Sequence, residues 1–158
     1  MTIPIGAGVL LGLLCVVWQF VVGFTGWYKD PVLLNLFFLV IPLEIGIVIW
    51  ALRKTARGTT WGGQVLNGLL LSVVAGVIIF AGSLLFTTVA FPDYFAEIQA
   101  TRAEMLKAGG LTEAQAGSQV ASATAMQTPL VNALTGVVGT VVTGTLVAAI
   151  AGAFMRKK

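Results

Sequence analysis

The sequence predicts an all-α integral membrane protein of one domain, a four-helix bundle with an extramembrane helical hairpin between helices three and four. Only 9% of the 158 residues are charged and 58% are hydrophobic, whereas about 25% are charged in soluble globular domains. Residues 1–28, 58–92 and 114–155 contain no charged residue, and residues 31–52 contain only one. Because about 20 apolar residues in a helix cross the ~30 Å core of a bilayer, four spans are expected.

Each span is bounded by turn-forming residues or by charge. The first helix is expected at about residues 4–24 and the second at about residues 31–52, with glycines and a proline framing the turn between them. The third is expected at about residues 63–91, where Pro92 should end or kink it. The fourth is expected at about residues 129–154.

Residues 93–128 form the one sizeable polar segment of the chain. Apolar residues recur at helical spacing through its first half. Gly109 and Gly110 should end that helix, and Thr112 with Gln115 makes a capping box that should start a second one. We therefore expect an outward-facing helical hairpin, attached at both ends to transmembrane helices.

The distribution of basic residues predicts the orientation in the membrane. With four spans, both termini lie on the same side as the loop at residues 53–63. That side carries six basic residues: Arg53, Lys54, Arg57, Arg156, Lys157 and Lys158. The opposite side carries Lys29, Arg102 and Lys107. The positive-inside rule then places both termini in the cytoplasm and the hairpin outside, in the periplasm. The six residues either bind anionic lipid headgroups or only set the topology.

Glu44 is the one charged residue inside a predicted span. It lies eight residues before Leu52, hence about 12 Å from the inner end of its helix and close to the midplane. An ionised carboxylate there costs about 2.5 kcal/mol or more, so we expect Glu44 to keep its proton at neutral pH and to face other helices. Matching depth gives Ser72, Thr143 and Thr145 as its candidate partners. Glu44 is either a hydrogen-bonded acid that specifies helix pairing or a proton- or ligand-linked site.

Two further polar side chains, Gln19 and Asn35, lie toward the outer part of the bilayer. By the rise per residue of a helix, they are near the level of Ser83 and Thr140. They either form a polar tier that links the first two helices or make two independent interhelix hydrogen bonds.

Small residues recur at every fourth position of the fourth helix. They are Gly136, Thr140, Gly144, Ala148 and Gly152. Such a ridge lets another helix backbone approach closely. Its partner is either a helix of the same bundle or a helix of another copy or subunit.

The residues of classical enzyme chemistry are scarce. The chain has no histidine, and its one cysteine, Cys15, lies in an apolar helix. There is no glycine-rich phosphate loop, no CxxC motif and no metal-ligand cluster. We expect neither catalysis nor a cofactor or metal, and no nucleic-acid partner, because membrane topology explains the basic residues.

These observations favour a small accessory or structural subunit in the lipid bilayer. It would act through helix–helix contacts in a homo-oligomer or a larger membrane complex. The alternative is a small carrier or channel-like protein in which Glu44 is an intramembrane protonatable site.

The order of several motifs resembles a known family. A basic loop is followed by WGG (Trp61–Gly63), a glycine-rich third helix, FPDYFAE at its outer end, GGLTEAQ, and a basic C-terminus. This order is similar to that of DUF4199, a bacterial family of four-helix membrane proteins of unknown function, over most of the chain. The resemblance implies that fold and the bacterial inner (cytoplasmic) membrane, and it implies no activity.

Overall fold

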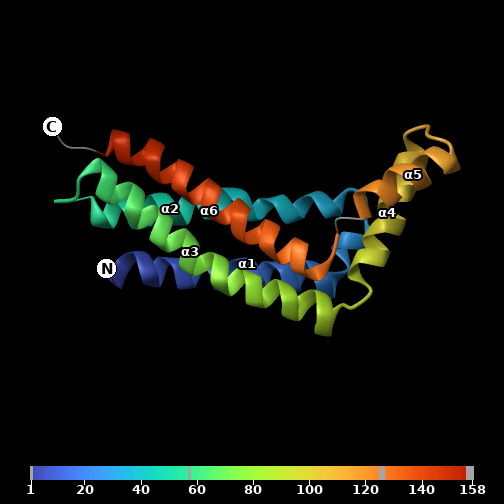
Figure 1. The fold of residues 1–158 in the computed structure, drawn as a ribbon, viewed down its shortest axis with the longest axis horizontal. Coiled ribbons are helices and arrows are strands. Elements are labelled where there is room, and N and C mark those ends of the chain that lie inside the picture. The colour runs from blue at the N-terminus through green and yellow to red at the C-terminus, as the bar shows by residue number, and fades with distance from the viewer. Residues whose placement is uncertain (1, 57, 125–126, 156–158) are drawn as a thin grey trace.

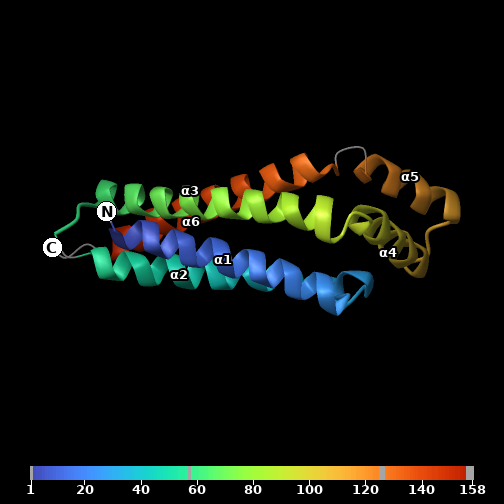
Figure 2. The same ribbon diagram turned by 90° about the horizontal axis from the view of Figure 1, so that it is seen from below.

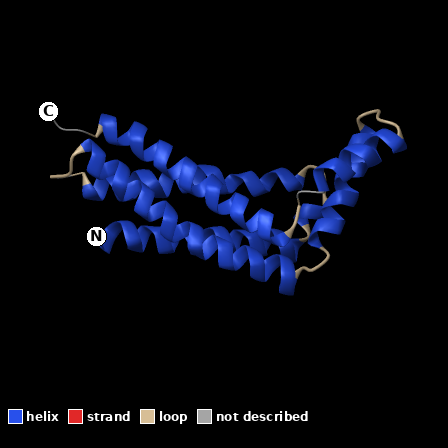
Figure 3. Ribbon diagram, in the orientation of Figure 1, coloured by secondary structure: helices blue, strands red, loops and turns tan. Residues whose placement is uncertain are grey.

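The computed structural model describes residues 2–56, 58–124 and 127–155, which contain helices and no strand (Figure 3). The helical elements, in chain order, are α1 (Thr2–Thr25), η1 (Trp27–Lys29), η2 (Leu33–Leu39), α2 (Val40–Thr55), α3 (Trp61–Leu85), η3 (Phe86–Ala90), α4 (Tyr94–Ala108), α5 (Glu113–Thr124) and α6 (Pro129–Phe154). Four stretches are long and apolar enough to cross a membrane: Thr2–Thr25, Leu33–Thr55, Trp61–Ala90 and Pro129–Phe154. The prediction of an all-helical chain with four such stretches is confirmed.

The four long helices run side by side along the longest axis of the molecule (Figures 1 and 2). The N-terminal end of α1, the C-terminal end of α6 and the facing ends of α2 and α3 lie at one end. The two shorter helices, α4 and α5, lie beyond the opposite end. Within the described residues, consecutive long helices therefore meet at neighbouring ends.

The long helices share one apolar core. Helix α3 packs against α1 and α6, and α2 packs against the same two helices from the other side. Leu11 of α1, Val48 of α2, Leu71 of α3 and Ala148 of α6 are fully buried in this core. Since lipid tails are as apolar as leucine, such a core is held in a bilayer by close packing rather than by escape from water.

Glycines make that close packing possible. A Cβ added to Gly12 of α1 would lie 2.8 Å from the Cβ of Ile78 on α3. One added to Gly76 of α3 would lie 3.1 Å from a methyl group of Val137 on α6. Both interfaces of α3 thus depend on positions where a larger residue would force the helices apart.

The second span is not the uninterrupted α-helix predicted from residue 31. It begins with a 3-10 segment, Leu33–Leu39, and becomes α-helical at Val40. Pro42, in the first turn of α2, has no N–H to donate to the carbonyl four residues earlier, and its ring crowds that carbonyl. Proline is tolerated in the first turn of an α-helix and disfavoured in its interior, which fits the start of α2 just before Pro42.

The third span begins and ends as its flanking residues dictate. Thr60 caps α3 by accepting a hydrogen bond from the backbone N–H of Gly63 at 3.2 Å. The last turn widens into the π-helical segment η3, where the N–H of Phe91 donates to the carbonyl of Phe86 at 2.8 Å. Helical structure stops before Pro92, as predicted.

The polar segment forms two helices, α4 and α5, that pack against each other. The N–H of Thr112 donates to the Gln115 side chain at 3.0 Å and the N–H of Gln115 donates back to Thr112 at 3.4 Å, so the predicted capping box is confirmed. Gly110, with φ of +93°, occupies the turn before it. Helix α4 also contacts η1, through Ile98 and Tyr28 in a small apolar cluster.

Candidate functional site

Glu44 lies where three of the long helices meet. Its side chain, on α2, is only 5% exposed. A Cβ added to Gly144 of α6 would lie 3.0 Å from the Cβ of Ser72 on α3 and 3.7 Å from Oε1 of Glu44. The carboxyl group is therefore enclosed by α2, α3 and α6 and does not face outward.

The carboxyl group lacks a full set of hydrogen-bond partners. Oε1 of Glu44 is buried without one, and so is the hydroxyl of Thr145 on α6. Ser72 lies beside Glu44, but its hydroxyl donates to the carbonyl of Gly68 in its own helix at 2.9 Å. An unpartnered buried polar atom costs about 1–3 kcal/mol, so the Glu44 carboxyl group is under-satisfied in this position.

Thr143, predicted together with Thr145 as a candidate partner of Glu44, is half-buried on α6. It also lines a groove with Thr135, Val138, Gly139 and Val142. A contact between Thr143 and Glu44 stays a prediction.

The predicted polar tier between Gln19 and Asn35 does not form. Gln19 is buried and accepts a hydrogen bond from the hydroxyl of Ser83 on α3 at 3.1 Å. Asn35 is exposed and donates to backbone carbonyls of its own segment, among them that of Val32 at 3.3 Å. The 3-10 geometry around Asn35 turns its side chain relative to the α-helix that was assumed. Thr140, expected at the same level, is buried.

The small-residue ridge of α6 lies against α3 along its length. Gly144 and Ala148 meet Ser72 and Gly68 of α3. A Cβ on Gly136 would lie 3.2 Å from Ile79, also on α3. At the other end, Gly152 faces Gln64 and Trp61, and the Trp61 indole donates to the carbonyl of Ala149 at 3.0 Å. The ridge is thus occupied within this chain.

The groove on the outer surface of α6 is a second small-residue feature of that helix. Thr135, Gly139 and Thr143 recur at four-residue spacing, and Val138 and Val142 complete the lining of a hollow of about 410 Å³. A Cβ added to Gly139 would have no neighbour within 4 Å. This glycine is therefore not required by packing inside the chain.

The basic residues are described only in part. Arg53 and Lys54 are exposed at the end of α2, and the Lys54 ammonium lies 4.2 Å from the centre of the Trp50 ring. The other four lie outside the described residues: Arg57, Arg156, Lys157 and Lys158. Cation–π contact with Trp50 keeps the Lys54 charge close to the end of the helix.

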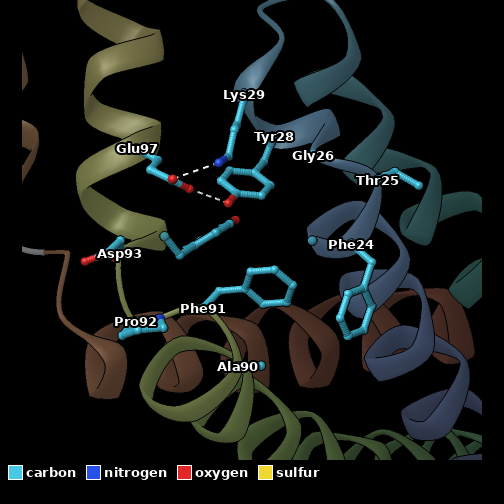
Figure 4. Close-up of a pocket in the computed structure, with 12 residues that line it drawn as sticks. Phe24, Thr25, Gly26, Tyr28, Lys29, Ala90, Phe91, Pro92, Asp93 and Glu97 are labelled. Carbon is cyan, nitrogen blue, oxygen red and sulfur yellow. Dashed lines mark hydrogen bonds and ion pairs between the residues drawn. The ribbon is translucent and has the colours of Figure 1, made fainter.

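A pocket that sequence reasoning missed lies at the opposite end, between η1 and the start of α4. The Lys29 ammonium contacts Oε1 of Glu97 at 2.7 Å, and the Tyr28 hydroxyl donates to Oε2 of the same carboxylate (Figure 4). Thr101 of α4 also donates to the Lys29 carbonyl at 3.4 Å. The sequence separation of 68 and 69 residues explains why no local pattern reveals this network.

The network changes the proton affinities of its members. Hydrogen bonds from Lys29 and Tyr28 lower the pKa of Glu97. The hydrogen bond to Glu97 raises the pKa of Lys29, and partial burial together with the same carboxylate raises that of Tyr28. Burial raises the pKa of the neighbouring Tyr94 to about 12. Near neutral pH, a carboxylate, an ammonium and two neutral phenols therefore surround the pocket.

Comparison with known proteins identifies the family and nothing finer. No curated protein and no solved structure matches the chain. The family model described as a protein of unknown function (DUF4199) matches residues 7–157, nearly the whole chain. The resemblance drawn from the WGG, FPDYFAE and GGLTEAQ segments is thereby confirmed, and the chain belongs to the DUF4199 family.

Proposed function

We propose that this protein is a four-helix bundle of the bacterial inner membrane, with both termini in the cytoplasm and the α4–α5 hairpin outside. The four apolar stretches support the spanning arrangement. The helix ends beside the basic clusters lie together at one end of the molecule, and the hairpin lies at the other (Figure 1). This arrangement fits the positive-inside rule.

Within that membrane, the protein acts as a structural or accessory subunit through helix–helix contacts and is not an enzyme. The observation that carries this proposal is the open groove at Gly139. A glycine midway along a span, flanked at four-residue spacing by Thr135 and Thr143, suits close approach of another helix. Because such a stripe is complementary to itself, we infer that the occupant is α6 of a second copy, as in a homo-oligomer.

The native mass of the purified protein tests this role. In a mild neutral detergent we expect at least a dimer of the 16.5 kDa chain. Gly139→Leu should convert it to a folded monomer, since nothing inside the chain lies within 4 Å of a Cβ there. Ile150→Leu, a change at an exposed position of α6 outside the groove, is the matched control. A monomeric wild type, or an oligomer indifferent to Gly139→Leu, would rule out this interface, and co-purification of a different subunit would assign the groove to a larger complex.

A second candidate function rests on the unpartnered Oε1 of Glu44. In a small carrier or channel-like protein, this carboxyl would exchange a proton or bind a ligand at the centre of the membrane. Glu44→Gln keeps the size and the hydrogen-bonding capacity of the side chain but cannot ionise. In proteoliposomes, this candidate predicts a pH-driven proton or cation flux that Glu44→Gln abolishes while folding and native mass stay unchanged. Identical flux from both proteins at every pH would leave Glu44 a purely structural acid.

A further inference from the structure

The pocket between η1 and α4 combines aromatic walls with a carboxylate. It encloses about 360 Å³ and is lined by the last turn of α1, by η1, by the end of η3 and by the start of α4. Phe24, Phe91 and Tyr28 bring their rings to it, and Glu97 brings the carboxylate (Figure 4). Phe24 is 77% exposed, so an apolar surface lies open beside a charged one.

The electrostatics of this pocket favour a cation. Two acidic residues, Glu97 and Asp93, and one basic residue, Lys29, line it. The Glu97 carboxylate points into the pocket, whereas that of Asp93 points away from it (Figure 4). Two helical segments, α1 and η3, end at its wall, and one, α4, begins there. The C-terminal end of a helix carries partial negative charge and the N-terminal end partial positive charge, so C-terminal ends outnumber N-terminal ends among these three. Aromatic faces add to this preference, because their quadrupoles attract cations.

The Lys29 side chain already places an ammonium group on the Glu97 carboxylate beside the Tyr28 ring. The Lys29 ammonium lies 2.7 Å from the Glu97 carboxylate and 5.4 Å from the centre of the Tyr28 ring. Its side chain is 53% exposed, and the pair is therefore of the weak, solvent-accessible kind. The long lysine side chain can swing into water and leave the carboxylate and the ring to another ammonium group.

We propose that this pocket binds a primary ammonium group carried on a short apolar chain. The ligand's ammonium replaces that of Lys29 on Glu97, accepted by the carboxylate and held near the Tyr28 ring. Its apolar chain lies along Phe24 and Phe91. Both a free amine and the headgroup of an aminophospholipid have this chemistry. The proposal is independent of the α6 groove, which lies outside the lining of this pocket.

The test uses n-hexylammonium as the probe and the purified full-length protein in a neutral detergent. Tryptophan fluorescence reports binding, because Trp18 and Trp27 pack in the cluster that contains Tyr28. We expect saturable binding of hexylammonium, and none of hexanol or hexanoate, which share the chain but not the charge. Glu97→Gln should weaken binding about tenfold or more, because a hydrogen bond to a charged group is lost.

The variant Lys29→Met tests most sharply whether Lys29 competes with the ligand for Glu97. If Lys29 competes for Glu97, removing its ammonium should tighten hexylammonium binding about two- to fivefold, the range of an exposed ion pair. The Lys107–Glu113 pair, at 2.9 Å and away from the pocket, supplies matched controls. Lys107→Met and Glu113→Gln should leave the affinity unchanged.

Several results would overturn the proposal. They are the absence of saturable hexylammonium binding, an affinity unaffected by Glu97→Gln, and weaker binding in Lys29→Met. Circular dichroism and native mass show whether each variant is folded. Because Lys29→Met and Glu97→Gln are expected to change affinity in opposite directions, general unfolding cannot mimic the pattern.

Repeating the titration in nanodiscs identifies the source of the ammonium. Weaker hexylammonium binding in phosphatidylethanolamine than in phosphatidylcholine assigns the lipid headgroup, and equal binding assigns a free amine.

Discussion

At the scale of single residues, the glycines of α6 differ in what surrounds them. A Cβ on Gly144 would meet Ser72 of α3, 3.0 Å from its Cβ, whereas a Cβ on Gly139 would meet nothing within 4 Å. Five residues rotate an α-helix by roughly 140° beyond a full turn, so the two glycines lie on different faces. The first serves packing within the chain, and the second is free to serve packing between chains.

We expect Gly144→Ala to be less stable than Gly139→Ala. Overpacking at a tight contact costs about 1–3 kcal/mol, and the gain in helix propensity from glycine to alanine is common to both variants. Unfolding by titration with a denaturing detergent measures the difference in free energy. Equal stabilities would mean that α3 and α6 are not as close at Ser72 as the structure has them.

At the scale of elements, a small contact connects the hairpin to the long helices. Val22, Tyr28 and Ile98 form its buried centre, and the Lys29–Glu97 pair lies at its edge. The hairpin is held by few apolar side chains, so even a weak ion pair at the edge should add to how firmly α4 docks on η1.

Docking of α4 should depend on pH at both extremes. Because its partners lower the pKa of Glu97, this stabilisation is present above the ordinary glutamate pKa of about 4.3 and is lost as the pH falls through the lowered value. Because the pKa values of Tyr28 and Lys29 are raised, their stabilisation is present below about pH 10 and is lost as the pH rises through the raised values.

Hydrogen exchange of the α4 amides, corrected for the intrinsic pH dependence of exchange, measures this docking. We expect protection to be constant around neutral pH and to fall in acid. In the variant Glu97→Gln, protection should no longer fall in acid. In Glu113→Gln, which removes the carboxylate of the Lys107 pair, protection should still fall. If protection still falls in acid in the Glu97→Gln variant, the pH dependence belongs to another group.

The sequence predicts where the helices lie better than it predicts the direction in which their side chains point. Length and apolar composition locate the four spans, and the pair Thr112 and Gln115 marks the start of α5, because these signals are local. The direction of Asn35 was missed, because the segment before Pro42 follows 3-10 geometry, with three residues per turn. The partner of Glu97 was missed because it lies 68 residues away, and only the assembled helices bring it near.

At the scale of the whole molecule, charge and apolar surface are segregated along one axis. The helix ends beside Arg53 and Lys54 lie at one end, and the polar hairpin lies at the other (Figure 2). Between them, Leu33–Thr55 is the least buried of the four spans, with 11% of its apolar stretch buried against 44% in the Trp61–Ala90 span. In a bilayer these exposed apolar side chains would face lipid or neighbouring helices.

The sidedness of two introduced cysteines tests this account most directly. In a Cys15→Ala background, Ala108→Cys at the exposed end of α4 and Gly62→Cys at the exposed start of α3 place one thiol at each end of the molecule. A Cβ at Gly62 has no neighbour within 4 Å, so the substitution is tolerated. An impermeant maleimide added to intact cells should label position 108 but position 62 only after the membrane is opened. Labelling of position 62 and protection of position 108 in intact cells would contradict the proposed topology.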